Sequence, residues 1–158
     1  MMVSKQYTYS ELESIITEKL SSGACVTIQP KGISMLPLIH QGRDEVVLKK
    51  PDGRLNKFDI VFYKRASGQF VLHRIIKVRK NDYILCGDNQ TEYEYNIKDD
   101  MILAVVDELI IDGKTVSVTD CEYLEYVKKN FRNIKKRRLI GKVKGFIKLI
   151  LRWEQRKK

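Results

Sequence analysis

Apolar residues near the start of the chain recur at the spacing of an α-helix. One face of this helix would carry four of them: Leu12, Ile15, Ile16 and Leu20. Ser10 and Glu13 have the spacing of an N-terminal capping box, and Gly23 ends the pattern. Residues 1–23 are therefore expected to contain a helix of about three turns that packs on the rest of the molecule.

From Ala24 the chain changes to short runs of β-branched and aromatic residues separated by turn residues. Five of these runs predict strands: Cys25–Gln29, Glu45–Lys49, Phe58–Tyr63, Phe70–Val78 and Tyr83–Cys86. Met101–Ile111 is apolar enough for a helix or a strand, but the turn at Asp112-Gly113 and the alternation in Lys114–Val118 favour a hairpin. Residues 24–120 are therefore expected to form one mainly β domain.

After Asp120 the spacing becomes helical again. A first apolar stripe contains Leu124, Val127, Phe131 and Ile134, and a second contains Leu139, Val143, Phe146, Ile147, Ile150 and Leu151. Basic residues lie off the second stripe. Residues 121–158 are thus predicted to form basic amphipathic helices, which makes the fold mainly β and α+β overall.

Charge is distributed very unevenly along the chain. The chain has 30 Lys or Arg and 20 Asp or Glu. From Lys128 onward there are 14 basic residues and one acid, which leaves 16 basic and 19 acidic residues before that point. All the excess positive charge is therefore in the tail, and the body is close to neutral, without the basic stripe of a nucleic-acid-binding domain.

The basic tail has the features of a helix that lies on a membrane surface. Lys135–Arg138 is a run of four basic residues beside the apolar stripe, and Trp153 lies near its end. Each basic residue near an anionic leaflet contributes roughly 1 kcal/mol. Membrane binding is the leading interpretation. A basic helix face packed against the body is the second, and nucleic-acid binding is the third.

The cysteines and the N-terminal residues bear on compartment and cofactors. Cys25, Cys86 and Cys121 form no CxxC pair, so buried reduced thiols are expected and neither a metal site nor another cofactor is indicated. Residues 1–22 contain no apolar run of signal-peptide length, and no stretch has the ~20 apolar residues of a membrane span. We expect a cytoplasmic protein, held peripherally on the inner face of the membrane by its tail.

Three short motifs carry the residue types of a nucleophilic hydrolase. Ser34 begins Ser-Met-Leu-Pro, His73 precedes an arginine, and Asp88 is the centre of Gly-Asp-Asn. A serine hydroxyl needs a base to take its proton and a third group to orient that base. His40 is the only other histidine, so few rival sets exist. Taken singly, the three would be a loop serine, a core histidine and a turn aspartate. Together they predict a catalytic set.

The surroundings of Ser34 are unusual for a solvated loop. Gly32 permits a sharp turn before it, and Pro37 restricts the chain after it. Such a turn can expose the hydroxyl and aim the Ser34 backbone N–H at a developing oxyanion. The neighbouring apolar residues suggest the floor of a substrate groove: Ile33, Met35, Leu36, Leu38 and Ile39.

Over Val26–Val118 the chain resembles the type I signal peptidase family. The resemblance lies in the order and approximate spacing of four motifs: Gly32-x-Ser34-Met35-x-Pro37, Lys57-Phe58-Asp59-Ile60-Val61-Phe62, His73-Arg74-Ile75 and Gly87-Asp88-Asn89. It is similar to the archaeal and endoplasmic-reticulum branch, in which a histidine replaces the lysine base. The resemblance implies a mostly antiparallel β fold, with Ser34 as nucleophile and His73 as general base.

For the third catalytic residue, Asp88 is the first candidate and Glu94 is the alternative. Asp88 matches the Gly-Asp-Asn motif itself, and Glu94 falls where the family has a second aspartate. Family members usually carry an N-terminal transmembrane anchor, which is not recognised in this sequence. The related LexA-like repressors use a Ser-Lys pair, whereas Phe70–Val78 offers a histidine at the corresponding place.

The sequence therefore predicts a Ser-His-acid endopeptidase that cuts leader or signal-type peptides near a membrane. The alternative is a non-catalytic peptide- or membrane-binding module that retains the fold. The expected partners are a peptide or preprotein substrate and an anionic membrane surface.

Overall fold

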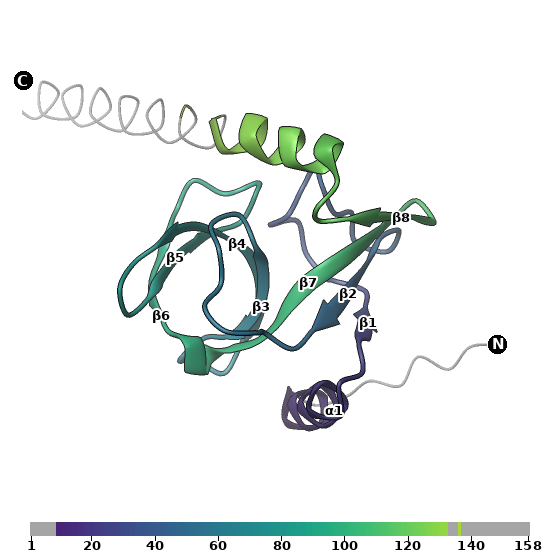
Figure 1. Ribbon diagram of the computed structural model, residues 1–158, viewed down its shortest axis with the longest axis vertical. Coiled ribbons are helices and arrows are strands. Elements are labelled where there is room, and N and C mark those ends of the chain that lie inside the picture. Colours follow the sequence, from purple (N-terminus) through teal and green to yellow (C-terminus); the bar gives the residue numbers. More distant parts are fainter. Residues whose placement is uncertain (1–8, 133–135, 137–158) are drawn as a thin grey trace, which may run out of the picture.

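The computed structural model describes residues 9–132 and 136, and consists mainly of an antiparallel β-sheet (Figure 1). Helix α1 spans Tyr9–Ser21, and a second α-helix occupies residues 121–132. The strands are β1 (Val26–Ile28), β2 (Glu45–Lys49), β3 (Ile60–Lys64), β4 (Phe70–Val78), β5 (Tyr83–Cys86), β6 (Glu94–Ile97), β7 (Ile102–Ile111) and β8 (Lys114–Ser117), with a 3-10 helix η1 (Asp99–Met101) before β7. The prediction of a mainly β, α+β fold is confirmed.

The strands form one sheet in the order β1-β2-β7-β3-β4-β5-β6, and β8 pairs with β7. Every pair is antiparallel. The sheet curls strongly, so that β3, β4, β5 and β6 surround a common interior in Figure 1. Register irregularities in β2–β7, β3–β7, β4–β5 and β5–β6 accompany this curl, as expected because bulges bend strands.

Both faces of the central strands are buried, and the two largest of the three buried hydrophobic clusters lie on opposite faces of β3. In β3, Ile60 and Phe62 face the core shared with α1 and β2, whereas Val61 and Tyr63 face the interior of the curl. The curl interior is filled by Leu55, Val61, Tyr63, Ile75, Tyr83, Leu85, Ile97 and Val105. This two-sided burial explains why β3 is a continuous apolar run rather than an alternating one.

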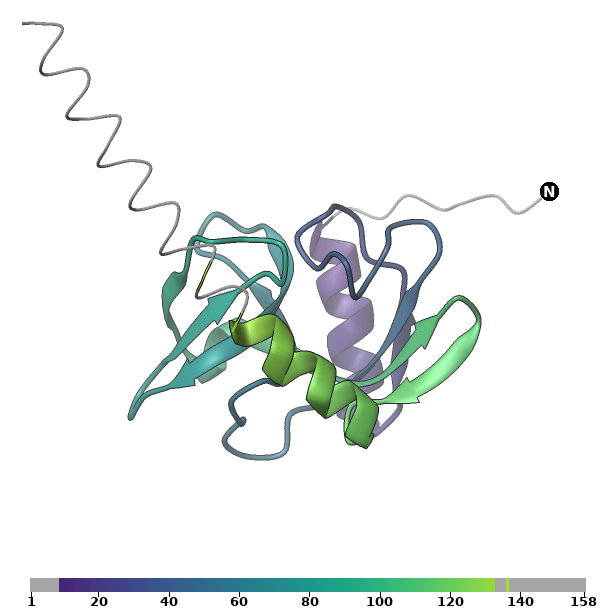
Figure 2. The same cartoon turned by 90° about the horizontal axis from the view of Figure 1, so that it is seen from above.

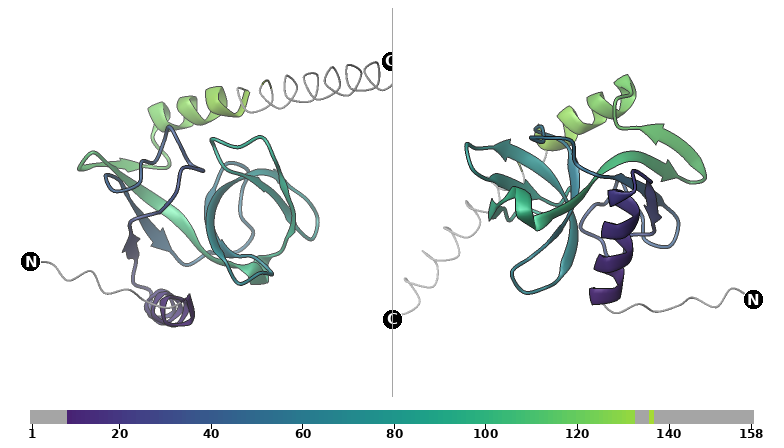
Figure 3. Two further views of the ribbon diagram at one scale, coloured as in Figure 1. Left: turned by 180° about the vertical axis from the view of Figure 1, so that it is seen from behind. Right: turned by 60° about the horizontal axis from the view of Figure 1, so that its bottom comes forward.

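The two helices cover the first core from different sides. Ile16 and Leu20 of α1 and Tyr123 and Val127 of the second helix are all buried in it. Figures 1 and 3 show the two helices at opposite ends of the molecule, and Figure 2 shows the second helix crossing between the curled strands and β8. Residues 121–132, expected as the start of the tail, thus complete the core of the β domain.

Only the beginning of the expected basic tail is included in this description. The second apolar stripe and Trp153 lie outside the described residues. Among residues 9–132 and 136, no helix combines the length and apolar character needed to cross a lipid bilayer.

Candidate active site

Ser34 lies in the loop between β1 and β2, which is held in place by its own apolar residues. Gly32 has φ of +98°, a left-handed conformation that favours glycine, directly before the serine motif. Met35 and Ile39 are buried in the first core and anchor the loop, so they do not form the expected groove floor. Ile33 is 68% exposed and is the apolar neighbour of Ser34 that faces solvent.

His73 lies on β4 and points into the curl of the sheet. Its backbone pairs with Val61 of β3, and its side chain shares a face with Val71 and Ile75, as the alternation predicts. Only 1% of His73 is exposed to solvent. A buried imidazole needs a partner for its ring N–H, and the structure supplies several polar groups at this position.

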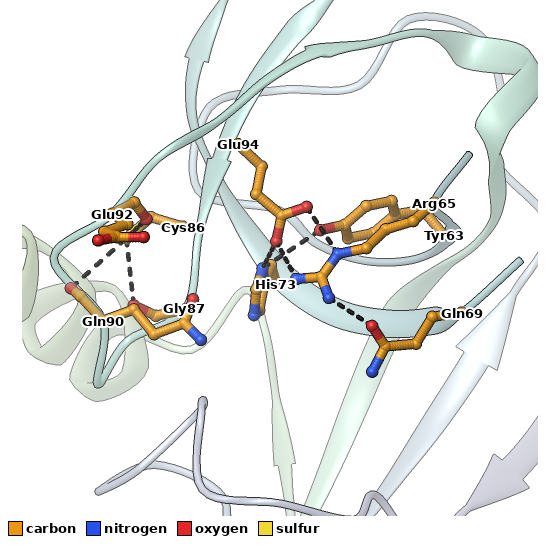
Figure 4. Close-up of polar contacts among 9 residues, drawn as sticks. All are labelled: Tyr63, Arg65, Gln69, His73, Cys86, Gly87, Gln90, Glu92 and Glu94. Atoms are coloured by element: carbon orange, nitrogen blue, oxygen red, sulfur yellow. Dashed lines mark hydrogen bonds and ion pairs between the residues drawn. The ribbon is translucent and has the colours of Figure 1, made fainter. Parts of the chain in front are cut away.

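Glu94, the first residue of β6, contacts Nδ1 of the His73 ring (Figure 4). Its Oε1 lies 2.9 Å from His73 Nδ1, and the Tyr63 hydroxyl lies 3.3 Å from the same nitrogen. Arg65, which follows β3, donates from Nε and Nη2 to the two Glu94 oxygens. Glu94 therefore accepts hydrogen bonds from both sides, and its carboxylate is fixed at the back of the imidazole.

Electrostatics keep Glu94 ionised in this position. Burial raises the pKa of Glu94, but hydrogen bonds from His73, Arg65 and Tyr63 outweigh burial and hold the pKa well below its ordinary value. Burial and the hydrogen bond to Glu94 raise the pKa of Tyr63, so its hydroxyl stays a donor. An ionised Glu94 can accept a hydrogen bond from His73 Nδ1, and Nε2 is then the ring nitrogen on the side away from the carboxylate.

Gly87 lies where His73 Nε2 comes close to the Ser34 loop. A Cβ atom built on Gly87 would lie 2.6 Å from the Ser34 backbone oxygen and 3.1 Å from His73 Nε2. Both atoms are thus near one point, and only glycine leaves room for this approach. Asn89 ties the same turn to the loop, because its backbone N–H donates to the Ser34 oxygen at 2.8 Å and its Nδ2 donates to the Ile33 oxygen at 3.2 Å.

Asp88 is buried and binds Arg74. The Arg74 guanidinium donates from Nε and Nη2 to the two Asp88 oxygens at 2.8 and 2.7 Å. Arg74 Nη1 also donates to the Phe58 backbone oxygen and to the Tyr123 hydroxyl of the second helix. Burial lowers the pKa of Arg74, but the interactions with Asp88 and Tyr123 more than offset this and hold the pKa above its ordinary value. Asp88 thus holds the Gly-Asp-Asn turn against β4 and the second helix.

The sequence favoured Asp88 as the acid beside His73, with Glu94 as the alternative, but the structure places Glu94 there. Glu94 contacts His73, whereas Asp88 contacts Arg74, the next residue along β4. Successive side chains on a strand point to opposite faces, so a carboxylate bound to Arg74 serves the other side of β4. Sequence reasoning missed Tyr63, Arg65 and Gln69, for which no motif gives a signal.

Comparison with protein-family models and with curated protein sequences finds no match to this chain. The likeness to type I signal peptidases therefore stays a proposal that depends on sequence motifs. Within the described residues, no group of three or more His, Cys, Asp or Glu side chains could hold a metal ion.

Proposed function

We propose that this chain is a serine endopeptidase in which Ser34 is the nucleophile, His73 the general base and Glu94 the residue that orients His73. The observation that carries the proposal is the placement of the imidazole. Its Nδ1 lies 2.9 Å from a carboxylate, and its Nε2 faces the turn that is bonded to the Ser34 loop. A base held by an acid on one side and a serine loop on the other is the arrangement that activates a hydroxyl.

In the proposed reaction, Ser34 Oγ attacks the carbonyl carbon of the scissile peptide bond while His73 Nε2 takes the hydroxyl proton. Glu94 stabilises the imidazolium that forms, and the Ser34 backbone N–H is the proposed donor to the oxyanion. His73 then gives its proton to the departing amine, which leaves an acyl-enzyme on Ser34. A water molecule, deprotonated by His73, attacks the ester carbonyl and releases the second product.

Leader or signal-type peptides are the proposed substrates. The motifs shared with type I signal peptidases support this substrate class, as does the exposed Ile33 beside the nucleophile, which offers an apolar contact to a peptide side chain. The 14 basic residues from Lys128 to Lys158 support a location on an anionic membrane surface.

The competing function is a peptide- or membrane-binding module without catalysis. The site argues against it, because binding an extended peptide needs neither a buried histidine nor a carboxylate at its back. A carboxylate held against a buried imidazole is costly to desolvate. Proton transfer by His73 gives this contact a use that peptide binding alone does not require.

Labelling with a fluorophosphonate, which reacts covalently with activated serines, tests the proposal. We expect the wild-type protein to gain one adduct, and peptide mapping to locate it on Ser34. Ser34→Ala and His73→Ala should abolish labelling, whereas Ser22→Ala, an exposed serine after α1, should label at the wild-type rate. If the folded wild-type protein is not labelled and cuts no peptide, the peptidase proposal is wrong and the non-catalytic binding module is favoured.

A further inference from the structure

We propose that Arg65 is a positioning residue that clamps the Glu94 carboxylate against His73 Nδ1. This inference rests on the proposed peptidase function and adds a residue that acts on the site through Glu94. Arg65 lies just beyond β3, in the turn that leads to β4, the strand that carries His73. The same hairpin therefore supplies both the base and the cation that fixes the acid behind it.

The clamp uses the guanidinium group in several directions. Arg65 Nε donates to Glu94 Oε2 at 2.9 Å, and Nη2 donates to Oε1, the oxygen that also contacts His73 (Figure 4). Nη1 donates to Gln69 Oε1 at 2.6 Å. The planar fork of arginine matches a carboxylate with two parallel bonds, which fixes its rotation as well as its position.

The turn itself holds Arg65 in place. The Arg65 backbone N–H donates to the Gln69 oxygen at 2.9 Å, and the Gly68 N–H donates to the Arg65 oxygen at 2.8 Å. Gln69 thus fixes Arg65 through both backbone and side chain. A clamp mounted on a closed turn loses little conformational entropy when it binds, so its position is well defined.

Glu94 needs such a clamp because its strand is short and lies at the end of the sheet. Strand β6 has four residues and pairs only with β5 along the strand order. The Glu94 side chain is 22% exposed, so its carboxylate has an escape route to water. Without Arg65, rotation of the Glu94 side chain toward solvent would leave Nδ1 without its ionised acceptor, and the two ring tautomers would compete.

The first experiment measures the rate of fluorophosphonate labelling of Ser34. Arg65→Gln should slow labelling about 10- to 100-fold, because a small misplacement of a catalytic group has effects of this size. Arg65→Lys keeps the charge but loses the planar fork, so its labelling rate should lie between those of Arg65→Gln and the wild type. Arg54→Gln is the matched control: Arg54 pairs with Asp99, is 34% exposed against 33% for Arg65, and should label at the wild-type rate.

A double-mutant comparison separates the clamp from a general effect on the fold. If Arg65 acts through Glu94, Arg65→Gln should slow labelling in the wild-type background and add almost nothing in Glu94→Gln. Equal slowing in both backgrounds, or wild-type labelling by Arg65→Gln, would overturn the inference. With a peptide substrate, the loss should appear in kcat rather than in KM, because the Arg65 guanidinium is bound to Glu94 and Gln69 and acts through Glu94.

A readout that needs no activity distinguishes failure of the clamp from failure of the peptidase proposal. A ring N–H bonded to a carboxylate gives a far-downfield proton NMR signal, and His40→Gln assigns it, since the chain has only two histidines. Arg65→Gln should broaden or shift the His73 signal, and Arg54→Gln should not. An unchanged signal in Arg65→Gln refutes the clamp. If the His73 signal is lost in Arg65→Gln but the wild-type protein is never labelled, the clamp is supported and the peptidase proposal is wrong.

Discussion

His73 Nδ1 and Glu94 Oε1 lie 2.9 Å apart, and this contact determines how the site can work. It orients the ring so that Nε2 faces the Ser34 loop, where Gly87 leaves room for the approach. Asp88, next to Gly87, binds Arg74 instead and holds the turn that completes the site. Two acids six residues apart thus have different partners: Glu94 contacts the His73 ring, and Asp88 contacts the Arg74 guanidinium.

The space beside Gly87 gives the first prediction. Gly87→Ala places a methyl group 2.6 Å from the Ser34 backbone oxygen and 3.1 Å from His73 Nε2, so the loop and the ring must move apart. We expect labelling of Ser34 to slow on the order of 100-fold. Gly53→Ala is the control. Gly53 has φ of +72° and open space around it, so an alanine there strains the backbone without pressing on other atoms. Similar labelling rates in the two variants would contradict the proposed closeness of loop and ring.

The buried Arg74–Asp88 pair gives a prediction about stability. Asp88→Asn leaves a fully buried guanidinium without an ionised partner, which should lower the free energy of unfolding by about 3–5 kcal/mol. Asp52→Asn, at an exposed turn, should change it by less than about 0.5 kcal/mol. Denaturant titration of both variants against wild type measures the difference. An Asp88→Asn protein as stable as wild type would show that Arg74 finds another partner.

The depressed pKa of Glu94 predicts a pH dependence of stability. A carboxyl whose pKa is lower in the folded state stabilises the fold above its ordinary pKa of 4.5, and this contribution is lost as the pH falls below it. The free energy of unfolding of Glu94→Gln should therefore be lower than that of wild type by about 1–3 kcal/mol at pH 7. The gap should begin to shrink below about pH 5 and keep shrinking as the pH falls toward the lowered folded-state pKa. A constant gap, or an equal effect from Glu125→Gln on the exposed face of the second helix, would contradict the assignment.

The charge of the tail predicts binding to anionic membranes. The full chain should sediment with vesicles that contain an anionic lipid and should be released by high salt, because exposed charges are screened. A protein that lacks residues 139–158 keeps the second helix at residues 121–132 and should stay in solution while it labels at the wild-type rate. Equal sedimentation of both proteins at low salt would exclude the tail as the anchor.

Much of the fold could be predicted because its strands are strongly patterned. Glu45–Lys49, Phe70–Val78 and Tyr83–Cys86 are strands with the predicted bounds. Ile102–Ile111 is a strand, as the predicted hairpin requires. Its own periodicity did not distinguish a helix from a strand, because residues on both of its faces are buried and the apolar pattern does not alternate. Glu94–Ile97 was missed, since this short strand carries one buried residue and three polar or aromatic ones.

The side of the second helix that packs on the body was predicted only in part. Its buried residues include Tyr123, whereas the stripe predicted from sequence began at Leu124, which is 38% exposed. The Tyr123 hydroxyl accepts a hydrogen bond from buried Arg74, a long-range contact that accompanies the burial of Tyr123. Local periodicity contains no information about such a partner.

Long-range contacts also limited what the sequence could predict about the candidate site. Ser34 and His73 stood out through their motifs, but the spacing of Asp88 and Glu94 along the chain could not decide which of them reaches the imidazole. The decision comes from the pairing of β5 with β6, which sets Glu94 opposite Leu85, inside the curl. Arg65 carried no signal in the sequence, because its role appears only when the β3–β4 hairpin brings it to Glu94.

The rate of fluorophosphonate labelling of Ser34 in Glu94→Gln and Asp88→Asn, measured at a temperature where both are folded, tests the central claim most directly. If Ser34, His73 and Glu94 form the catalytic unit, Glu94→Gln should slow labelling on the order of 10³-fold and Asp88→Asn by less than about tenfold. His73→Ala sets the lower limit of the series. Labelling of Glu94→Gln at the wild-type rate, or a larger loss in Asp88→Asn than in Glu94→Gln, would contradict the account.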